Sequence, residues 1–429
     1  MLYEEARVYL DQVSKYGSVL GLDSIRELLD RLDNPQNKLQ FIHIAGTNGK
    51  GSILAYISTI LKEAGYKTGR YISPTVMDYM ERFQVNGAYM REDALVEITE
   101  QVKAAADSMT AEGLPSPTAF EIETAIAFLF FVKEKCDVVV LETGLGGLLD
   151  ATNIVENVKA CVFASISRDH MGVLGNTLAE IAENKAGIIK EGAVVVAGVQ
   201  QTEAMQVLER TAKEKHCLFV EVEPEKLQRI SNTIDGQEFS YKEYKNLKIR
   251  LLGNYQLENV CTALEVLRIL NNDGMQISEE AVQKGLADTK WPGRFQVLQK
   301  EPLVIVDGAH NIDAIRRLIE NIEIYLKGKK IVAIMGVFKD KEHKEMVKMI
   351  APYLEKAYAV DLPNAERTLP KESLKEELLA NGVPTETAEN HIEALKRAEK
   401  EGTKEQVIIG FGSLSYLGDM IRYKDGKEE

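Results

Sequence analysis

Cysteine is scarce in this sequence. The four cysteines, Cys136, Cys161, Cys217 and Cys261, are widely spaced and form no C-x-x-C pair. This spacing argues against zinc ribbons and against a disulfide framework. It suits a reducing compartment, and we expect the chain to work in the cytoplasm.

Long apolar runs are also missing. The longest, Ala127 to Val132 and Val138 to Leu141, are far shorter than the roughly 20 residues of a membrane-spanning helix. The first residues, MLYEEARVYLDQV, are acidic and amphipathic and do not resemble a secretion signal. We therefore expect neither export nor a membrane partner.

Positive charge is in short supply as well. The formal net charge is −14 and no local basic patch stands out, so attraction to a phosphate backbone would act against the global field. Nucleic acid is therefore not an expected partner. Hydrophobic residues make up 45% and charged residues 28% of the chain, which is the balance of a soluble globular protein.

Short apolar runs alternate with helical patterns along most of the chain. A length of 429 residues is too great for one ordinary core, so we expect two domains. One clear helical pattern covers Ser52 to Ala64. The predicted strands are Phe41 to Ile44, Asp137 to Leu141, Lys159 to Ala164, Ala193 to Val199, Leu303 to Val306, Ile331 to Met335, Lys356 to Val360 and Gln406 to Ile409. Such alternation predicts the doubly wound α/β class, with parallel sheets and crossover helices.

The segment Trp291-Pro292-Gly293-Arg294 is the best candidate for a domain junction. Proline and glycine interrupt a helical pattern there, just before a new strand–helix series begins. We place the boundary near Phe295, which gives domains 1–295 and 296–429. The charged tail, Tyr423 to Glu429, is predicted to be a solvated, frayed end.

The loop GTNGKGS, from Gly46 to Ser52, is the first candidate for chemistry. It fails the pattern G-x-x-x-x-G-K-[ST], because two residues are missing and the hydroxyl of Ser52 comes one place late. A strand, a glycine-rich turn and a helix nevertheless bring backbone N–H groups and the positive end of the helix dipole to one point. We interpret the loop as a phosphate site with Lys50 as its point charge; the alternative is a turn needed only for packing.

Acidic and imidazole side chains follow two further predicted strands. Glu142 ends the run CDVVVLE, where it is placed to hold Mg²⁺ beside a nucleotide. The glycines of GLGG that follow lack the spacing of a dinucleotide fingerprint, so NAD is discounted. Asp169 and His170 follow another strand, and a neutral imidazole there can ligate a metal, although a lone histidine is more often structural. Lys185 by itself is typical of a surface lysine.

The second half repeats this design in LVIVDGAHN, with Asp307, His310 and Asn311 after a strand. Arg294 precedes that strand in the predicted junction. A guanidinium there could reach a phosphate, or could form a salt bridge between domains. A cleft between two α/β domains is a common ligand site.

Together these segments resemble the folylpolyglutamate synthase and dihydrofolate synthase family, within the superfamily of Mur-type ATP-dependent amide ligases. The likeness covers nearly the whole chain. Its motifs, in family order, are GTNGKGS, SP…ERFQVNG, TAFE, ETGLGG…LDATN, DHMGVLGNT…KAGI, GNYQLEN, WPGRF, DGAHN and GFGSLSYLG. The resemblance implies an N-terminal P-loop ATPase-type parallel-sheet domain and a smaller C-terminal Rossmann-like α/β domain. The shortened phosphate loop is the form this family uses.

Carried over residue by residue, the resemblance implies a nucleotide site, a metal site and a substrate site. The nucleotide site would comprise Gly46, Thr47, Asn48, Gly49, Lys50, Gly51, Ser52, Asn259, Arg294, Asp307 and His310. Mg²⁺ would be held by Ser73, Glu142 and His170. Lys185 matches the family lysine that becomes carbamylated, and Lys50, Lys185 and His170 are the expected catalytic residues. Thr118, Phe120 and Asp150 fall where the family binds the pterin-bearing substrate.

Some positions depart from the family pattern. Thr75 stands where the family often has an aromatic residue or histidine, and Leu148 stands where it commonly has arginine. These changes bear on the form of the substrate and leave the ATP chemistry unaffected. The segment GVFKDKEH, Gly336 to His343, also differs, and the sequence assigns it no role.

The expected activity is addition of L-glutamate to a folate, or to dihydropteroate, by a monomer that uses ATP and Mg²⁺. Two alternatives stay open. One is a Mur-type ligase that acts on a peptidoglycan precursor, which the SP…ERFQVNG and GLGG…LDATN segments disfavour. The other is a nucleotide-binding switch, although the nearest string to N-K-x-D, Asn184-Lys185-Ala186-Gly187, lacks the aspartate.

Overall fold

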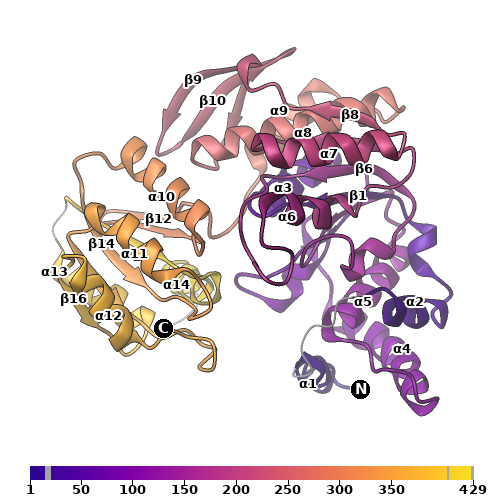
Figure 1. Cartoon of the computed structure of the whole chain (residues 1–429), viewed down its shortest axis with the longest axis horizontal. Helices are drawn as coiled ribbons and strands as arrows, with labels where there is room; N and C mark the ends of the chain where they lie inside the picture. The colour runs from indigo at the N-terminus through magenta and orange to yellow at the C-terminus, as the bar shows by residue number, and fades with distance from the viewer. Residues whose placement is uncertain (15–20, 403–404, 427–429) are drawn as a thin grey trace.

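The computed structural model describes residues 1–14, 21–402 and 405–426, which form two α/β lobes (Figure 1). The larger lobe is built on an eight-stranded sheet in the order β4-β3-β2-β5-β1-β6-β7-β8. Its strands are β1 (Phe41–Ala45), β2 (Thr68–Tyr71), β3 (Phe83–Val85), β4 (Ala88–Tyr89), β5 (Val138–Glu142), β6 (Val158–Phe163), β7 (Val194–Ala197) and β8 (Leu218–Glu221). The strands from β2 to β8 in this order are parallel, and β3 and β4 form an antiparallel edge.

Helices cover both faces of this sheet, because the residues of β1 and β5 and most of those of β6 are buried on both sides. One face packs against α3 (Lys50–Glu63), α8 (Asn254–Asn272) and α9 (Glu279–Asp288). The other face divides between two groups, the first being α1 (Tyr3–Ser14), α2 (Asp23–Asp30), α4 (Glu92–Ala111) and α5 (Ala119–Lys133). The second group is α6 (Leu178–Ala186) with α7 (Thr202–Glu214).

A small antiparallel sheet projects beside α8 and α9 at the top of Figure 1. It consists of β9 (Leu227–Thr233), β10 (Gly236–Tyr241) and β11 (Tyr244–Ile249) in the order β11-β10-β9. Phe239 and Leu247 anchor it in the same core as α3 and α8. The sequence pattern misses these three strands, because β9 is largely exposed and polar.

The smaller lobe carries a six-stranded sheet in the order β12-β13-β17-β14-β15-β16. Its strands are β12 (Gln296–Lys300), β13 (Leu303–Asp307), β14 (Lys330–Met335), β15 (Lys356–Ala359), β16 (Thr385–Thr387) and β17 (Gln406–Phe411). Only β12 among them runs antiparallel to its neighbour. One face packs against α10 (Ile312–Tyr325), α11 (His343–Ile350) and α12 (Lys371–Ala380), and the other packs against α13 (His391–Glu401) and α14 (Leu417–Lys424).

The predicted fold class and all eight predicted strands are confirmed. The predicted junction lies between α9 and β12, and Phe295 immediately precedes the first strand of the second sheet. The division into 1–295 and 296–429 itself stays a prediction. In the part of the chain that the structure describes, no helix is long and apolar enough to cross a membrane.

The prediction of a frayed end from Tyr423 is wrong for its first two residues, which lie in α14. The Lys424 side chain is only 11% exposed because its ammonium pairs with Glu399 and donates to Oε1 of Gln299 at 3.0 Å. Tertiary ion pairing therefore extends the helix into the charged tail. Residues 427–429 lie outside the described residues.

Candidate active site

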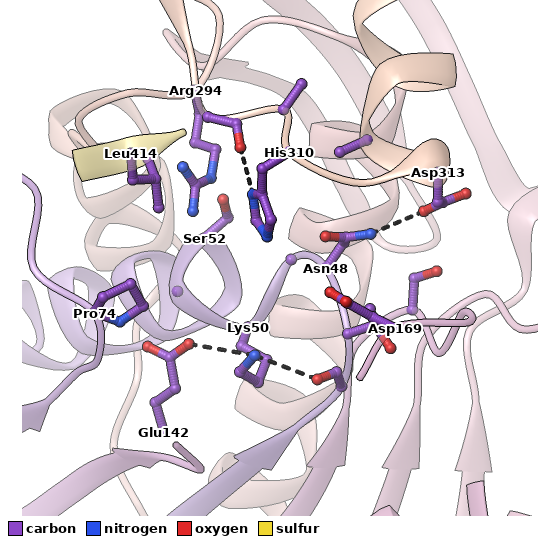
Figure 2. A pocket seen from close by; sticks show the side chains of 18 of the residues that line it. Asn48, Lys50, Ser52, Pro74, Glu142, Asp169, Arg294, His310, Asp313 and Leu414 are labelled. Carbon is purple, nitrogen blue, oxygen red and sulfur yellow. Dashed lines mark hydrogen bonds and ion pairs between the residues drawn. The ribbon is translucent and has the colours of Figure 1, made fainter. Parts of the chain in front are cut away.

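A cavity of about 600 Å³ lies between the two lobes. Its walls come from the loop after β1, from the ends of β5 and β6, from α8, and from the junction before β12. The smaller lobe contributes the segments that follow β13, β14 and β17. The carboxyl ends of the parallel strands of both sheets thus face one space, which is where α/β sheets bind ligands (Figure 2).

The predicted phosphate loop joins β1 to α3. The N–H groups of Thr47 and Asn48 donate to the carbonyl oxygen of Ser165 at 2.8 and 3.2 Å, which fixes the first half of the loop against the end of β6. Helix α3 begins at Lys50, so the N–H groups of its first turn have no partner within the helix. These N–H groups and the positive end of the helix dipole indicate that the cavity can bind an anion.

Close contacts explain two glycines of the loop. Gly49 has a φ of 96°, and a Cβ there would lie 2.5 Å from Oδ1 of Asn259. A Cβ on Gly51 would lie 2.3 Å from the ring of Trp291. The loop is therefore held between α8 and the junction, where only glycine fits.

Ser52, the late hydroxyl of the loop, is 2% exposed. Its Oγ accepts a hydrogen bond of 3.1 Å from the side-chain amide of Gln256 on α8. Since Ser52 also lines the cavity, the hydroxyl hydrogen is still available to an acceptor there.

Lys50 and Glu142 face each other across the cavity floor (Figure 2). The ammonium of Lys50 lies 3.7 Å from Oε1 of Glu142 and donates to the carbonyl oxygen of Gly46 at 3.3 Å. Burial raises the pKa of Glu142, and the charges of Lys50 and Arg294 oppose that shift. Because these two charges do not fully offset the effect of burial, the carboxylate is suited to hold a further cation.

The three predicted metal ligands, Ser73, Glu142 and His170, all line the cavity. The backbone N–H of Ser73 donates to the Glu142 carboxylate. Burial lowers the pKa of His170, which keeps the imidazole in its ligating, neutral form. The described residues contain no group of three or more His, Cys, Asp or Glu side chains that could hold a metal. Mg²⁺ does not need one, because it usually takes one or two carboxylates together with substrate phosphates and water.

Lys185 is not the surface lysine that its sequence context alone predicts. It lies at the end of α6 with only 4% of its surface exposed, and its ammonium donates to the Gly46 carbonyl oxygen at 2.9 Å. Burial lowers the pKa of Lys185 to about 7, and the nearby charge of Lys50 adds to the effect. Packing of α6 against the sheet thus lowers the affinity of this amine for its proton.

Asp169 joins the two lobes at the edge of the cavity. It accepts from Nζ of Lys341 at 2.9 Å and from Nδ2 of Asn311 at 3.1 Å. Burial alone would raise the pKa of Asp169, but Lys341 holds it well below its usual range. A second contact between the lobes runs from Nδ2 of Asn48 to Oδ2 of Asp313 at 3.0 Å (Figure 2).

Arg294, Asp307 and His310 also line the cavity, as the sequence predicts. Both oxygens of Asp307 accept backbone N–H groups at 2.8 Å, from Phe295 and from Ala309. Burial raises the pKa of Asp307 to about 6 despite the charge of Arg294. The Nδ1–H of His310 donates to the Gly308 carbonyl oxygen at 2.7 Å, because a carbonyl can only accept, so Nε2 of the neutral ring carries a free lone pair.

Thr118, Phe120 and Asp150 do not line the cavity. They gather behind one of its walls, the loop that includes Gly144 and Leu145. Thr118 caps the helix that carries Phe120, and the Phe120 ring lies 2.5 Å from the position of a Cβ on Gly144. Asp150 accepts the N–H of Leu145 at 2.7 Å. The structure therefore places all three predicted substrate residues behind this loop and not in the cavity itself.

The sequence matches two known domains, the Mur ligase middle domain over residues 44–267 and the Mur ligase, glutamate ligase domain over residues 293–414. It is 34% identical over 427 residues to the dihydrofolate synthase/folylpolyglutamate synthase of Bacillus subtilis (strain 168), and this match covers 97% of the chain and 98% of the relative. The chain belongs to the folylpolyglutamate synthase and dihydrofolate synthase family. The predicted family, the enzyme class of ATP-dependent carbon–nitrogen ligases and glutamate addition to folates as the family activity are thereby confirmed.

Solved structures of this synthase family support the assignment. Folylpolyglutamate synthase from Thermotoga maritima matches with a TM-score of 0.85 and 31% identity, over 98% of this chain and 96% of that chain. The structure of E. coli FolC in complex with DHPP and ADP matches with a TM-score of 0.86 and 29% identity, over 99% and 98%. The fold is therefore that of the synthase family along its whole length.

The sequence gives no role to several residues that line the cavity. Trp291 stands in a quoted motif and packs on the phosphate loop, and Lys341 stands in the segment left without a role. Others that line it are Asp313, Arg317, Phe338, Arg367 and Ser413. Many of these residues follow strands of the smaller sheet, and position after a parallel strand is the signal that could have found them.

Proposed function

We propose that this ligase joins L-glutamate to the carboxyl group of a folate through an acyl phosphate. A carboxylate does not react with an amine at neutral pH because the oxygen is a poor leaving group. Transfer of the γ-phosphoryl group of ATP to a carboxylate oxygen releases ADP and gives the acyl phosphate. The amine of glutamate then attacks the carbonyl carbon, loses a proton and expels inorganic phosphate, which leaves an amide.

The observation that carries this proposal is the meeting of the phosphate loop and Glu142 in a cavity shared by two sheets. Lys50 and Arg294 both line the cavity. Lys50 would neutralise the transferred phosphoryl group, and Arg294 would add a cation from the junction side. Phosphoryl transfer depends mainly on position and charge. The second lobe forms part of the cavity wall, and its closure over the site would protect the acyl phosphate from water.

The proposed metal is Mg²⁺, with Ser73, Glu142 and His170 as the residues that would hold it. The fit rests on the buried, incompletely neutralised carboxylate of Glu142 and on the neutral imidazole at the cavity edge. When bound, Mg²⁺ would neutralise phosphate charge. Lys50 and the first-turn N–H groups of α3 would orient the same phosphates.

Lys185 is the proposed site of a carbamate. Only an unprotonated amine reacts with CO₂, and a pKa of about 7 leaves a substantial unprotonated fraction at neutral pH. The product is an anion, which would replace the repulsion between Lys185 and Lys50 by attraction. A second cation could then be held beside the phosphate loop.

Dihydropteroate is proposed as a second acceptor beside tetrahydrofolate. Support comes from the double name of the Bacillus subtilis relative and from the E. coli FolC structure with DHPP. Thr118, Phe120 and Asp150 are proposed to serve this substrate through the loop that they support. A cytoplasmic location, a monomeric state and the absence of nucleic-acid partners stay predictions.

The proposal is tested with purified protein, ATP, Mg²⁺ and radiolabelled glutamate, offered tetrahydrofolate or dihydropteroate separately, with products resolved by mass. Stimulation of ADP release by a UDP-muramoyl compound instead of a folate would favour the peptidoglycan alternative. ADP release without a glutamylated product would favour a nucleotide switch.

Substitution of Lys50 or Glu142 by alanine is expected to abolish folate- and glutamate-dependent ADP release while the fold stays intact. Lys50→Ala removes the cation that would contact the phosphates, and Glu142→Ala removes the carboxylate opposite it. Lys62→Ala is the matched control, because Lys62 lies at the far end of the same helix with a side chain 46% exposed. Wild-type turnover in either site variant would overturn the assignment.

A further inference from the structure

His43 is a polar residue in the middle of the larger core. It lies on the central strand β1 and is fully buried. Its Nε2 lies 2.9 Å from Oγ1 of Thr152, while its Nδ1 has no hydrogen-bond partner. An imidazole with one unpaired nitrogen costs stability at a position where an aliphatic side chain would fit. This cost calls for a role that an aliphatic residue could not perform.

Hydrogen bonds link His43, Thr152 and Asp150 in a row. The direction of each of these bonds follows from the state of Asp150. Burial raises the pKa of Asp150, but its two oxygens accept backbone N–H groups, from Leu145 at 2.7 Å and from Thr152 at 3.1 Å, and these bonds oppose the rise and favour the carboxylate. Oγ1 of Thr152 also lies 2.5 Å from Oδ1 of Asp150, so its hydroxyl hydrogen points to that oxygen. The nitrogen of His43 that faces Thr152 must then carry a hydrogen and donate it.

We infer that His43 is a positioning residue, which acts through Thr152 and Asp150 on the cavity wall formed by Gly144 and Leu145. Its Nε2–H fixes the direction of the Thr152 hydroxyl, and that hydroxyl holds the Asp150 carboxylate so that it captures the N–H of Leu145. Gly144, Leu145 and Gly146 all line the cavity. The substrate affected is the folate, and this part of the inference rests on the proposed function of the loop.

The same chain of bonds ties the wall to the phosphate loop, because β1 leads directly into Gly46. ATP, however, is proposed to bind on α3 and its own loop, which already have independent supports at Ser165 and Asn259. A substitution of His43 should therefore weaken binding of the folate more than binding of the nucleotide. This difference separates a positioning role from a general loss of packing.

The first test is the protonation state of His43 in the full chain without ligands. Long-range ¹H–¹⁵N NMR on protein labelled with ¹⁵N-histidine, with the signal assigned by its loss in His43→Gln, is expected to show a neutral ring with hydrogen on Nε2. The ring should stay neutral from pH 5.5 to pH 8, because burial lowers the pKa of His43 to about 3. An Nδ1–H tautomer, or titration in that range, would overturn the inference without touching the proposed function.

The second test uses matched pairs of variants. His43→Gln and Thr152→Ser keep a donor in the chain, whereas the shorter His43→Asn and the isosteric Thr152→Val break it. Breaking the chain should raise KM for tetrahydrofolate about tenfold and leave KM for ATP within about twofold, and the conserving variants should stay near wild type. Thermal unfolding checks the fold, and if His43→Asn does not fold, the Thr152 pair decides. An unchanged folate KM in Thr152→Val, or equal rises for both substrates, would overturn the inference.

Discussion

Single side chains in this protein owe their chemistry to burial, and Lys185 shows it most clearly. The sequence places it in the last turn of a helix, where lysine is common and unremarkable. The fold removes 96% of its surface from water, since only 4% remains exposed, and sets it near Lys50. Sequence pattern predicts the helix, but it cannot predict which face of α6 meets the phosphate loop.

The lowered pKa of Lys185 predicts a specific dependence of stability on pH. The pKa of Lys185 is about 7 in the folded state, whereas in the unfolded chain it is the ordinary lysine value of 10.5. The unfolded state therefore binds more protons between these values, and the free energy of unfolding should rise with pH across this window. The rise contributed by this one group can be at most about 1.4 kcal/mol per pH unit.

Urea unfolding of wild type and Lys185→Met at pH 6.5 to 9, in buffers free of CO₂, measures this effect. The difference in free energy of unfolding between the two should grow in favour of the wild type as the pH rises. A constant difference would contradict the buried, neutral amine. Added bicarbonate should then stabilise the wild type more than the variant, because the variant lacks the buried amine at this position.

At the scale of elements, strands that carry apolar runs could be predicted and polar or edge strands could not. All eight predicted strands exist because their apolar residues are largely buried. The sequence of β2, TGRY, has no apolar run, so the pattern does not predict this strand. It joins the sheet by pairing with β5. The predicted site residues at strand ends, such as Glu142 and Asp307, lie at the cavity because parallel strands share an edge.

The start of α3 offers a test of how the loop is held. Gly51→Ala should weaken nucleotide binding about tenfold or more, because the new methyl group overlaps the ring of Trp291, which lies 2.3 Å from its position. Binding is measured by calorimetry with ADP. In the double variant with Trp291→Ala the two effects should not add, since removal of the ring removes the overlap. Additive losses would mean that Gly51 matters for another reason.

At the scale of the whole molecule, the two lobes are joined across the cavity by a few polar contacts. The Asp169–Lys341 pair is the most buried ion pair among these, with both side chains about one-tenth exposed, at 12% and 11%. Residues of both lobes must meet to enclose an acyl phosphate. The sequence predicts the two lobes and part of the residues that line the cavity between them, but not this pairing, because it joins segments 172 positions apart.

Lys341→Met should therefore lower turnover about tenfold, because Asp169 loses its cation and the closed arrangement loses a contact. Small-angle X-ray scattering should show a larger radius of gyration for this variant with bound nucleotide. Lys339→Met is the control, since Lys339 is exposed and has no ion pair among the described residues. Equal effects of both substitutions would show that the pair does not join the lobes.

The central claim is that ATP activates the carboxyl group of the folate before glutamate attacks. It is tested most directly with a tetrahydrofolate whose γ-carboxylate carries ¹⁸O at both oxygens, incubated with ATP, Mg²⁺ and glutamate. The account predicts that each new amide bond sends one ¹⁸O atom into inorganic phosphate, as measured by mass spectrometry. Glutamylated product with unlabelled phosphate would contradict it.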